Sequence, residues 1–231
     1  MYRILDDLKQ RIDKCMTYEQ LRALRDHIHE ELHDHLLFND SAVRNSVVNS
    51  CHDCIIQRTI AIAEARFRVD HAIRPTGPYA FILFGSGGRF EQTLWSDQDN
   101  GLIYANDDPA SHEYYKQLSA ALEQGLKLVG YPPCEGDVVA GNDQWRKPIA
   151  HWHNMLSDWL QDPSWENVRQ LLIVADVRFL YGDESLVQQL KDVYDELIVR
   201  TPGIHEGLLR NTLRHKVVIG PFGNLIREPY G

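Results

Sequence analysis

The chain has 231 residues, 43% of them hydrophobic, and a formal net charge of −9. So acidic a chain argues against bulk binding of nucleic acid, although a single nucleotide needs only a local site. Its apolar runs fall short of the roughly 18 residues of a membrane-spanning helix, and its charged first residues lack the apolar core of a signal peptide. We therefore expect a cytoplasmic protein that binds no membrane.

The N-terminal third of the chain has the periodicity of amphipathic helices. Apolar residues recur at helical spacing in residues 4–12 and 21–32, and Thr17 with Gln20 has the form of a capping box. A long helix is predicted over residues 42–69. The four histidines of residues 27–35 are interpreted as a solvated polar face, and the four cysteines of the chain as thiols of helix cores.

The pattern changes after the proline- and glycine-rich break at residues 74–78. The apolar run 79–84 predicts a buried strand that ends in a glycine-rich turn, and residues 99–105 predict a second strand. A helix over residues 111–129, stopped by a glycine, and a third short strand over residues 137–141 are expected to follow. From Gln144 onward all segments are predicted to be helical, with helices over residues 165–181 and 184–199 among them.

The segment from Phe84 to Tyr104 carries the chemistry of the sequence. A glycine-rich turn after a strand aims several backbone N–H groups at one point, which suits a phosphate. Ser86 adds a hydroxyl donor, and the guanidinium of Arg89 can reach phosphate oxygens. The alternative to a binding site is a polar loop in which the acidic residues cap a turn.

Asp97 and Asp99 follow about ten residues after this turn. On a strand, residues i and i+2 point to the same face, with Cα atoms about 6.6 Å apart. Carboxylates so spaced can converge on Mg²⁺ or Mn²⁺, which prefer oxygen ligands, and without a cation they repel each other. The turn and the acidic pair together favour a site that binds a metal and a nucleotide.

Gly85-Ser86 followed by Asp97-x-Asp99 resembles the signature of the polymerase-β nucleotidyltransferase superfamily. The fuller run GSGGR-x-EQTL-x-SDQDN resembles a bacterial group within it, which is related to the uridylyltransferase of the PII signalling protein and is often found beside cyclic-nucleotide-binding and CBS domains. Cys134–Trp145 and the residues Asp176, Arg178 and Gly182-Asp183 extend the resemblance over most of the chain. Gln98 departs from the wider superfamily, where an apolar residue is common.

The resemblance implies a role for each matching residue. Asp97 and Asp99 would bind the metal, and superfamily members usually have a third carboxylate on a later strand. We predict Asp137 as that catalytic and metal-binding residue, with Glu135 and Asp143 as rivals. The predicted nucleotide-binding residues are Gly85, Ser86, Gly87, Arg89 and Ser96.

The resulting prediction is an α/β (α+β) protein with a small mixed sheet, flanked by an N-terminal helical segment and a C-terminal helical bundle. Its parts are residues 1–74 (helical segment), 75–143 (catalytic core) and 144–231 (helical substrate-binding domain). The resemblance implies that this last domain continues beyond the segment at 220–226, so we expect the second substrate's site to be incomplete.

The predicted function is Mg²⁺-dependent transfer of a nucleoside monophosphate, UMP or AMP, from a nucleoside triphosphate. The acceptor is the hydroxyl of a protein side chain or a small molecule, and the role is in signalling. The alternative is a regulatory module that binds a nucleotide without transferring it and acts through a protein partner. The sequence leaves the choice of nucleotide and acceptor open.

Overall fold

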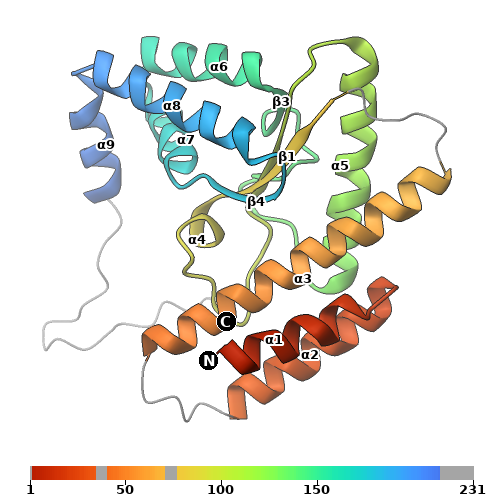
Figure 1. Cartoon of the computed structure of the whole chain (residues 1–231). Helices are drawn as coiled ribbons and strands as arrows, with labels where there is room; N and C mark the ends of the chain where they lie inside the picture. The colour runs from red at the N-terminus through yellow and green to blue at the C-terminus, as the bar shows by residue number, and fades with distance from the viewer. Residues whose placement is uncertain (1, 35–40, 71–76, 214–231) are drawn as a thin grey trace, which may run out of the picture.

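The computed structural model describes residues 2–34, 41–70 and 77–213. In this part of the chain a small sheet lies between two groups of helices (Figure 1). Four strands form the sheet in the order β3-β2-β1-β4. The central strand β1 pairs antiparallel with β2 and β4, and β2 pairs parallel with β3. The strands are β1 (Tyr79–Leu83), β2 (Asn100–Tyr104), β3 (Arg146–Pro148) and β4 (Arg178–Gly182).

Helices cover both faces of this sheet. One face is covered by α3 (Ser41–Asp70) and α5 (Pro109–Val129), and α1 (Tyr2–Asp13) and α2 (Tyr18–Asp34) pack against these two helices. The other carries α6 (Ile149–Gln161), α7 (Trp165–Ala175), α8 (Glu184–Arg200) and α9 (Ile204–Leu213), and the single turn α4 (Gly85–Gly88) follows β1.

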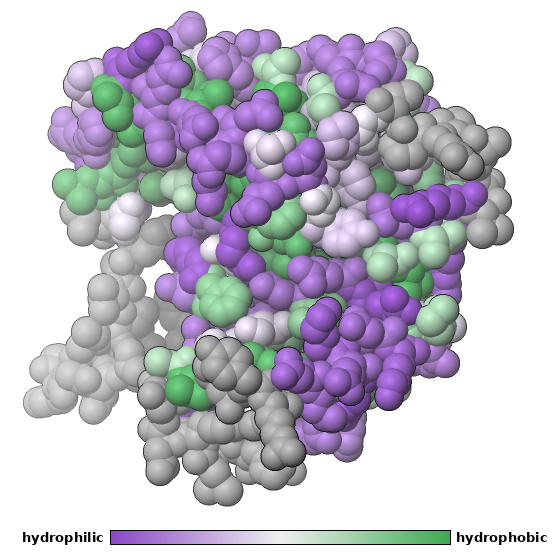
Figure 2. Space-filling model, viewed as in Figure 1, coloured by the Kyte–Doolittle hydropathy of each residue, from purple (hydrophilic) through white to green (hydrophobic). Residues whose placement is uncertain are grey.

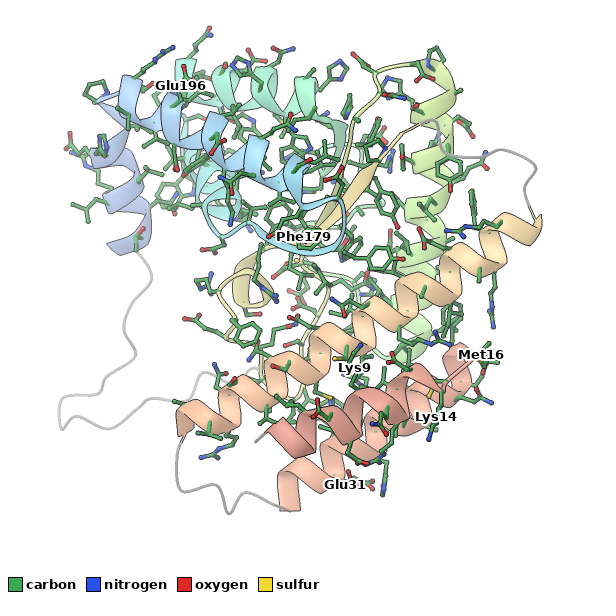
Figure 3. The ribbon with its side chains drawn as sticks, viewed as in Figure 1. Lys9, Lys14, Met16, Glu31, Phe179 and Glu196 are labelled. Atoms are coloured by element: carbon green, nitrogen blue, oxygen red, sulfur yellow. The ribbon has the colours of Figure 1, made fainter. Side chains whose placement is uncertain are left out.

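Two hydrophobic cores result, one on each face of β1. Phe81 and Leu83 belong to the core with the N-terminal helices, whereas Ala80 and Ile82 belong to the core with α6–α9. Phe179 of β4 packs against the second core (Figure 3). A strand covered on both faces reads as one continuous apolar run, which is the pattern of residues 79–83.

The predicted fold class is confirmed: a mixed α/β architecture, mostly helical in its described residues. The long helix predicted over 42–69 corresponds to α3, and the strands predicted at 79–84 and 99–105 correspond to β1 and β2. The helix predicted over 111–129 begins earlier, at Pro109, because the side chain of Asp108 accepts a hydrogen bond from the N–H of Ser111 and caps it. It ends at Gly130, which has a left-handed φ of 108°.

Three local predictions are wrong. Residues 137–141 form turns instead of a strand, and only one of their backbone groups, the Val138 carbonyl, accepts from β2. β3 and β4 fall in the part of the chain that was predicted to be entirely helical. β3 has three residues and β4 five, too few for periodicity to distinguish a strand from a helix, and pairing with β2 and β1 decides their conformation. The three-part division of the chain stays a prediction.

The histidine prediction holds only in part. His27 is mainly exposed and pairs with Glu31 of α2, a residue labelled in Figure 3. His29, by contrast, is buried and meets the ring of Trp95 edge-on, at 5.3 Å between ring centroids. The side chain of His33 and the whole of His35 lie outside the described residues.

The face of the molecule in Figure 2 is largely hydrophilic, as the composition suggests. No helix in the described ranges has the length and apolarity to cross a membrane.

Candidate active site

The glycine-rich turn after β1 is the single helical turn α4. Gly85 has a φ of +51°, and a Cβ there would lie 2.7 Å from Oδ2 of Asp99. At Gly88 a Cβ would collide with the carbonyl oxygen of Asp176. These two glycines therefore let a carboxylate and a second backbone segment approach the turn closely. The first N–H groups of a helical turn have no partner within it, which leaves them available to an anion.

Two carboxylates and a thiol converge beside this turn. The ligand atoms of Asp97, Asp99 and Cys134 all lie within 4.8 Å of one another. Asp97 is exposed, and the other two are half-buried. The N–H of Phe84 donates to the carbonyl of Asp99 at 3.0 Å, so the end of β1 fixes the backbone that carries this carboxylate.

The electrostatics of this cluster disfavour two bare carboxylates. Burial, and then the nearby charges of Asp97 and Asp176, raise the pKa of Asp99, although a hydrogen bond from Cys134 and the charge of Arg89 oppose the rise. Burial and the neighbouring carboxylate of Asp99 raise the pKa of Cys134 to about 11, so its thiol stays protonated at neutral pH. A cation at this position would offset the repulsion.

A small cavity lies behind the turn and is not the place for a nucleotide. Its volume is about 10 Å³, roughly the space of one water molecule. Among its lining residues are Ser86, Asp99, Gln92 and Gln98, and the Oε1 atoms of the two buried glutamines have no hydrogen-bond partner within the protein. A nucleotide must therefore approach from the open side, where Asp97 is exposed.

Arg89 lies at the end of the turn and is already paired. Its guanidinium contacts the carboxylates of Glu91, at 2.8 Å, and Asp176, through a very short ion pair. Asp176 ends α7, and burial raises its pKa even though Arg89 opposes this. A phosphate group would have to compete with these carboxylates for the guanidinium.

Arg178 supports the turn from β4. Its Nε donates to the carbonyl of Gly87 at 2.9 Å, and its two terminal nitrogens each lie 2.8 Å from the carboxylate of Asp53 on α3. Such a two-pronged pair holds the guanidinium in one orientation. The turn is thus clamped between α3 and the sheet.

The loop that leads to Asp97 is held by α3. Asn45 donates to the carbonyl of Phe90 at 2.8 Å. Asn49 accepts from the N–H of Gln92 at 2.8 Å and donates to its carbonyl at 3.2 Å. These residues recur every four positions along the helix, so one helix face follows the loop.

His52, one turn further along α3, also contacts this loop. Its Nε2 is 2.8 Å from the carbonyl of Thr93, and its Nδ1 is 2.7 Å from the hydroxyl of Tyr131. Burial lowers its pKa to about 4, so the ring is neutral at pH 7. A neutral ring that donates from Nε2 to Thr93 can accept the Tyr131 hydroxyl hydrogen at Nδ1.

The structure brings some of the predicted site residues together and separates others. Asp97 and Asp99 meet beside the turn that contains Gly85, Ser86 and Gly87, with Arg89 at its end. The Ser96 hydroxyl donates to the Thr93 carbonyl at 3.4 Å, within the loop.

None of the three candidates for a third carboxylate belongs to the described cluster. Asp137 is exposed, has a φ of +55°, and accepts a hydrogen bond at 2.7 Å from Asn142. Glu135 is exposed as well, and Asp143 forms an ion pair with Arg146.

Four residues near the site were given no role from the sequence: Cys134, Asp176, Asn49 and His52. Cys134 and Asp176 lay in segments that carried the resemblance, but nothing in their spacing placed them beside the acidic pair. Asn49 and His52 lie outside the apolar stripe predicted for their helix, so its periodicity gave no sign that both side chains are buried and paired.

A sequence model of one protein family, described as "Putative nucleotidyltransferase DUF294", matches residues 22–166. This range is more than half of the chain and includes α3, the turn, the acidic pair and Cys134. No curated protein matches the chain.

Proposed function

Because the chain belongs to this putative nucleotidyltransferase family, we propose that it transfers UMP or AMP from a nucleoside triphosphate to a hydroxyl group. The acceptor is a protein side chain or a small molecule, and the transfer serves signalling in a bacterial cell. The observation that carries the proposal is the convergence of Asp97 and Asp99 beside the glycine-rich turn α4.

The residues of the cluster fit a hard divalent cation. Asp97 and Asp99 would hold Mg²⁺ or Mn²⁺ through carboxylate oxygens, the ligands these ions prefer. The raised pKa of Asp99 agrees with this, since a buried carboxylate beside other acids is costly until a cation is bound. When bound, the ion would supply Lewis-acid stabilisation of charge on the transferred phosphoryl group.

The protein's own groups divide the remaining work. N–H groups of α4 and the hydroxyl of Ser86 donate to phosphate oxygens, and the buried Gly87 lets the turn pack closely on Leu83 and Gln92. Arg89 leaves Asp176 and pairs with the triphosphate, where it stabilises the negative charge that moves to the leaving pyrophosphate. The acceptor hydroxyl then loses its proton to a nearby carboxylate.

That third carboxylate has two candidates. Asp137 was predicted from the sequence, but it is bound to Asn142 and lies outside the cluster. The charge of Asp176 raises the pKa of Asp99, so the two carboxylates are near each other. Asp176 loses its ion pair when Arg89 pairs with the nucleotide. Asp176 is therefore the better-placed base, and a comparison of Asp176→Asn with Asp137→Asn tests the assignment.

The experiment begins with thermal unfolding in the presence of ATP, UTP, GTP or CTP, each with and without Mg²⁺ or Mn²⁺. A ligand that binds only the folded state raises the melting temperature. The nucleotide that gives a metal-dependent shift is then supplied with an α-phosphate label, and pyrophosphate release and labelled products are measured.

Turnover should vanish in Asp97→Asn and Asp99→Asn and persist in Asp158→Asn, which removes an exposed carboxylate from α6. Retained turnover in both aspartate variants would contradict the metal assignment.

The second candidate function is nucleotide binding without transfer, with a protein partner as the target. It is favoured by the third member of the described cluster, which is a thiol where a transferase of this kind usually has a carboxylate. Metal-dependent nucleotide binding with no pyrophosphate release, under conditions that offer protein and small-molecule hydroxyls, would support this alternative over transfer.

A further inference from the structure

A groove separate from the candidate active site lies between α5 and the junction of β3 and α6. Its volume is about 450 Å³, within the roughly 300–1,000 Å³ of small-molecule sites. Tyr104, the last residue of β2, lines it, whereas Asp99 immediately precedes the first residue of that strand. Four residue rises of about 3.4 Å put some 14 Å between the two ends of β2, so the groove is a distinct site.

Both walls of the groove carry basic side chains. His112 and Lys116 come from α5, Arg146 and Lys147 from β3, and His151 from α6. Such a concentration is unusual in a chain with a net charge of −9. The lining holds three cations, Lys116, Arg146 and Lys147, against the acids Glu113 and Asp143, an excess that favours a small anion, whereas the acidic rest of the chain would repel a long polyanion.

Of the two acidic groups that line the groove, Asp143 is paired with a cation and Glu113 has no such partner among the described residues. Asp143 forms a very short ion pair with Arg146, whose guanidinium also donates to the carbonyls of Ala140 and Gly141. Glu113 accepts a hydrogen bond from the side chain of Gln117. The side chain of Arg146 is therefore held in one position, and its charge is partly neutralised by Asp143.

A chain of hydrogen bonds orders the two histidines. Asp107 lies between them, 2.9 Å from Nε2 of His112 and 2.9 Å from Nε2 of His151. Nδ1 of His112 is 2.6 Å from the hydroxyl of Tyr104, and the two imidazole rings stack with centroids 6.0 Å apart. This part of the groove is preorganised, which lowers the entropic cost of binding a ligand.

The two lysines have no such partners. Neither Lys116 nor Lys147 forms an ion pair with any residue that the structure describes. Lys147 is half-buried, and both its burial and the adjacent Arg146 lower its pKa. A half-buried ammonium next to another cation is destabilised until an anion approaches it.

We propose that this groove binds a small molecule through a phosphate group, with Lys116 and Lys147 as the principal contacts on opposite walls. The ligand differs from the substrate of the transfer site and does not take part in that reaction. Arg146 connects the groove to the segment before β3, where the N–H of Ala140 donates at 2.9 Å to the side chain of Asn100, the neighbour of Asp99. Its occupant is therefore placed to act as an effector.

The test is calorimetric titration of the full chain with inorganic phosphate and, in parallel, with citrate, at matched ionic strength and without metal or nucleotide. Lys147→Met removes the charge and keeps the apolar stem, and Lys116→Gln removes the charge on α5. Lys127→Gln is the matched control, because it is an exposed lysine of the same helix outside the groove.

We expect phosphate to bind the wild type and Lys127→Gln alike, and the dissociation constant to rise at least tenfold in Lys147→Met and Lys116→Gln. Tighter binding of citrate than of phosphate would overturn the ligand class. Absence of binding, or binding that is unchanged in both groove variants, would overturn the site.

Discussion

Removing the side chain of Asn49 should test whether α3 positions the loop of the proposed metal site. Asn49 is fully buried and holds both backbone polar groups of Gln92, five residues before Asp97. Asn49→Ala leaves that N–H and that carbonyl without their partner. The variant does not touch the carboxylates themselves, so any loss of metal binding has to come from a displaced loop.

The structure bounds the size of the effect. A buried backbone group without a partner costs about 1–3 kcal/mol, so Gln92 held in place would cost about 2–6 kcal/mol. For a chain of this size each kcal/mol lowers the melting temperature by about 2–4 °C, which gives a fall of about 4–24 °C. If the loop instead moves to reach water, the loss of stability is smaller and appears as weaker metal binding. Groups that orient metal ligands typically contribute about 10–100-fold in affinity.

Mn²⁺ binding, measured by electron paramagnetic resonance below the melting temperature, separates these effects. Thr59→Val is the matched control, because Thr59 is a fully buried polar residue of α3 whose hydroxyl bonds only to its own helix, at the Ile55 carbonyl. We expect Asn49→Ala to bind Mn²⁺ at least tenfold more weakly than the control. Equal affinities would refute the positioning role. Should Asn49→Ala not fold, Asn45→Ala removes the milder, exposed contact with Phe90.

Three further predictions follow from the geometry of the site. Asp176→Asn should tighten nucleoside triphosphate binding severalfold in a fluorescence titration because it releases Arg89, and unchanged affinity would contradict competition for that guanidinium. Burial lowers the pKa values of His29 and His52 to about 4 in the folded protein. Because the unfolded chain then binds more protons than the folded one, the free energy of unfolding should fall as pH falls from 6.5 to 4. Thermal unfolding of His52→Gln should depend less steeply on pH than that of the wild type, and an identical dependence would contradict the lowered pKa of His52. Cys134→Ser should weaken Cd²⁺ binding far more than Mg²⁺ binding in equilibrium dialysis, since sulfur is the softer ligand, and a parallel loss of both would mean that the thiol does not face the metal.

The sequence predicted the parts of the fold that have strong local signals. β1 is a continuous apolar run between a proline-rich break and glycines, and α5 has both a cap and a terminating glycine. β4 could not be predicted in this way, because its five residues follow a helix without a proline and only pairing with β1 makes them a strand. β3 is three residues long and is defined by its parallel pairing with β2.

The same distinction applies to the candidate site. Asp97, Asp99 and the turn lie within 15 positions of one another along the chain, so their proximity could be inferred from spacing. Cys134 reaches the cluster from 35 positions beyond Asp99, and Asp176 reaches Arg89 from 87 positions away. Such contacts depend on how β4 and the segment after α5 pack, which periodicity does not encode. Asp137 was a reasonable choice by distance in sequence, but the turn at residues 134–137 directs it to Asn142.

Helix α3 contacts both the loop before Asp97 and the arginine that supports the glycine-rich turn. The helix supports the loop at Phe90, Gln92 and Thr93, and its Asp53 fixes Arg178 against the turn.

The opposite face of α3 is tied to the other N-terminal helices. The side chain of Arg58 donates to the carbonyl of Cys15 at 2.7 Å, and Arg11 of α1 pairs with Glu31 of α2 at 3.1 Å. Because one rigid helix makes both sets of contacts, a force applied to α1 or α2 reaches the backbone before Asp97 without passing through the sheet. The N-terminal helices are therefore linked through α3 to the loop before Asp97, and we expect a partner that displaced them to disturb the position of this loop.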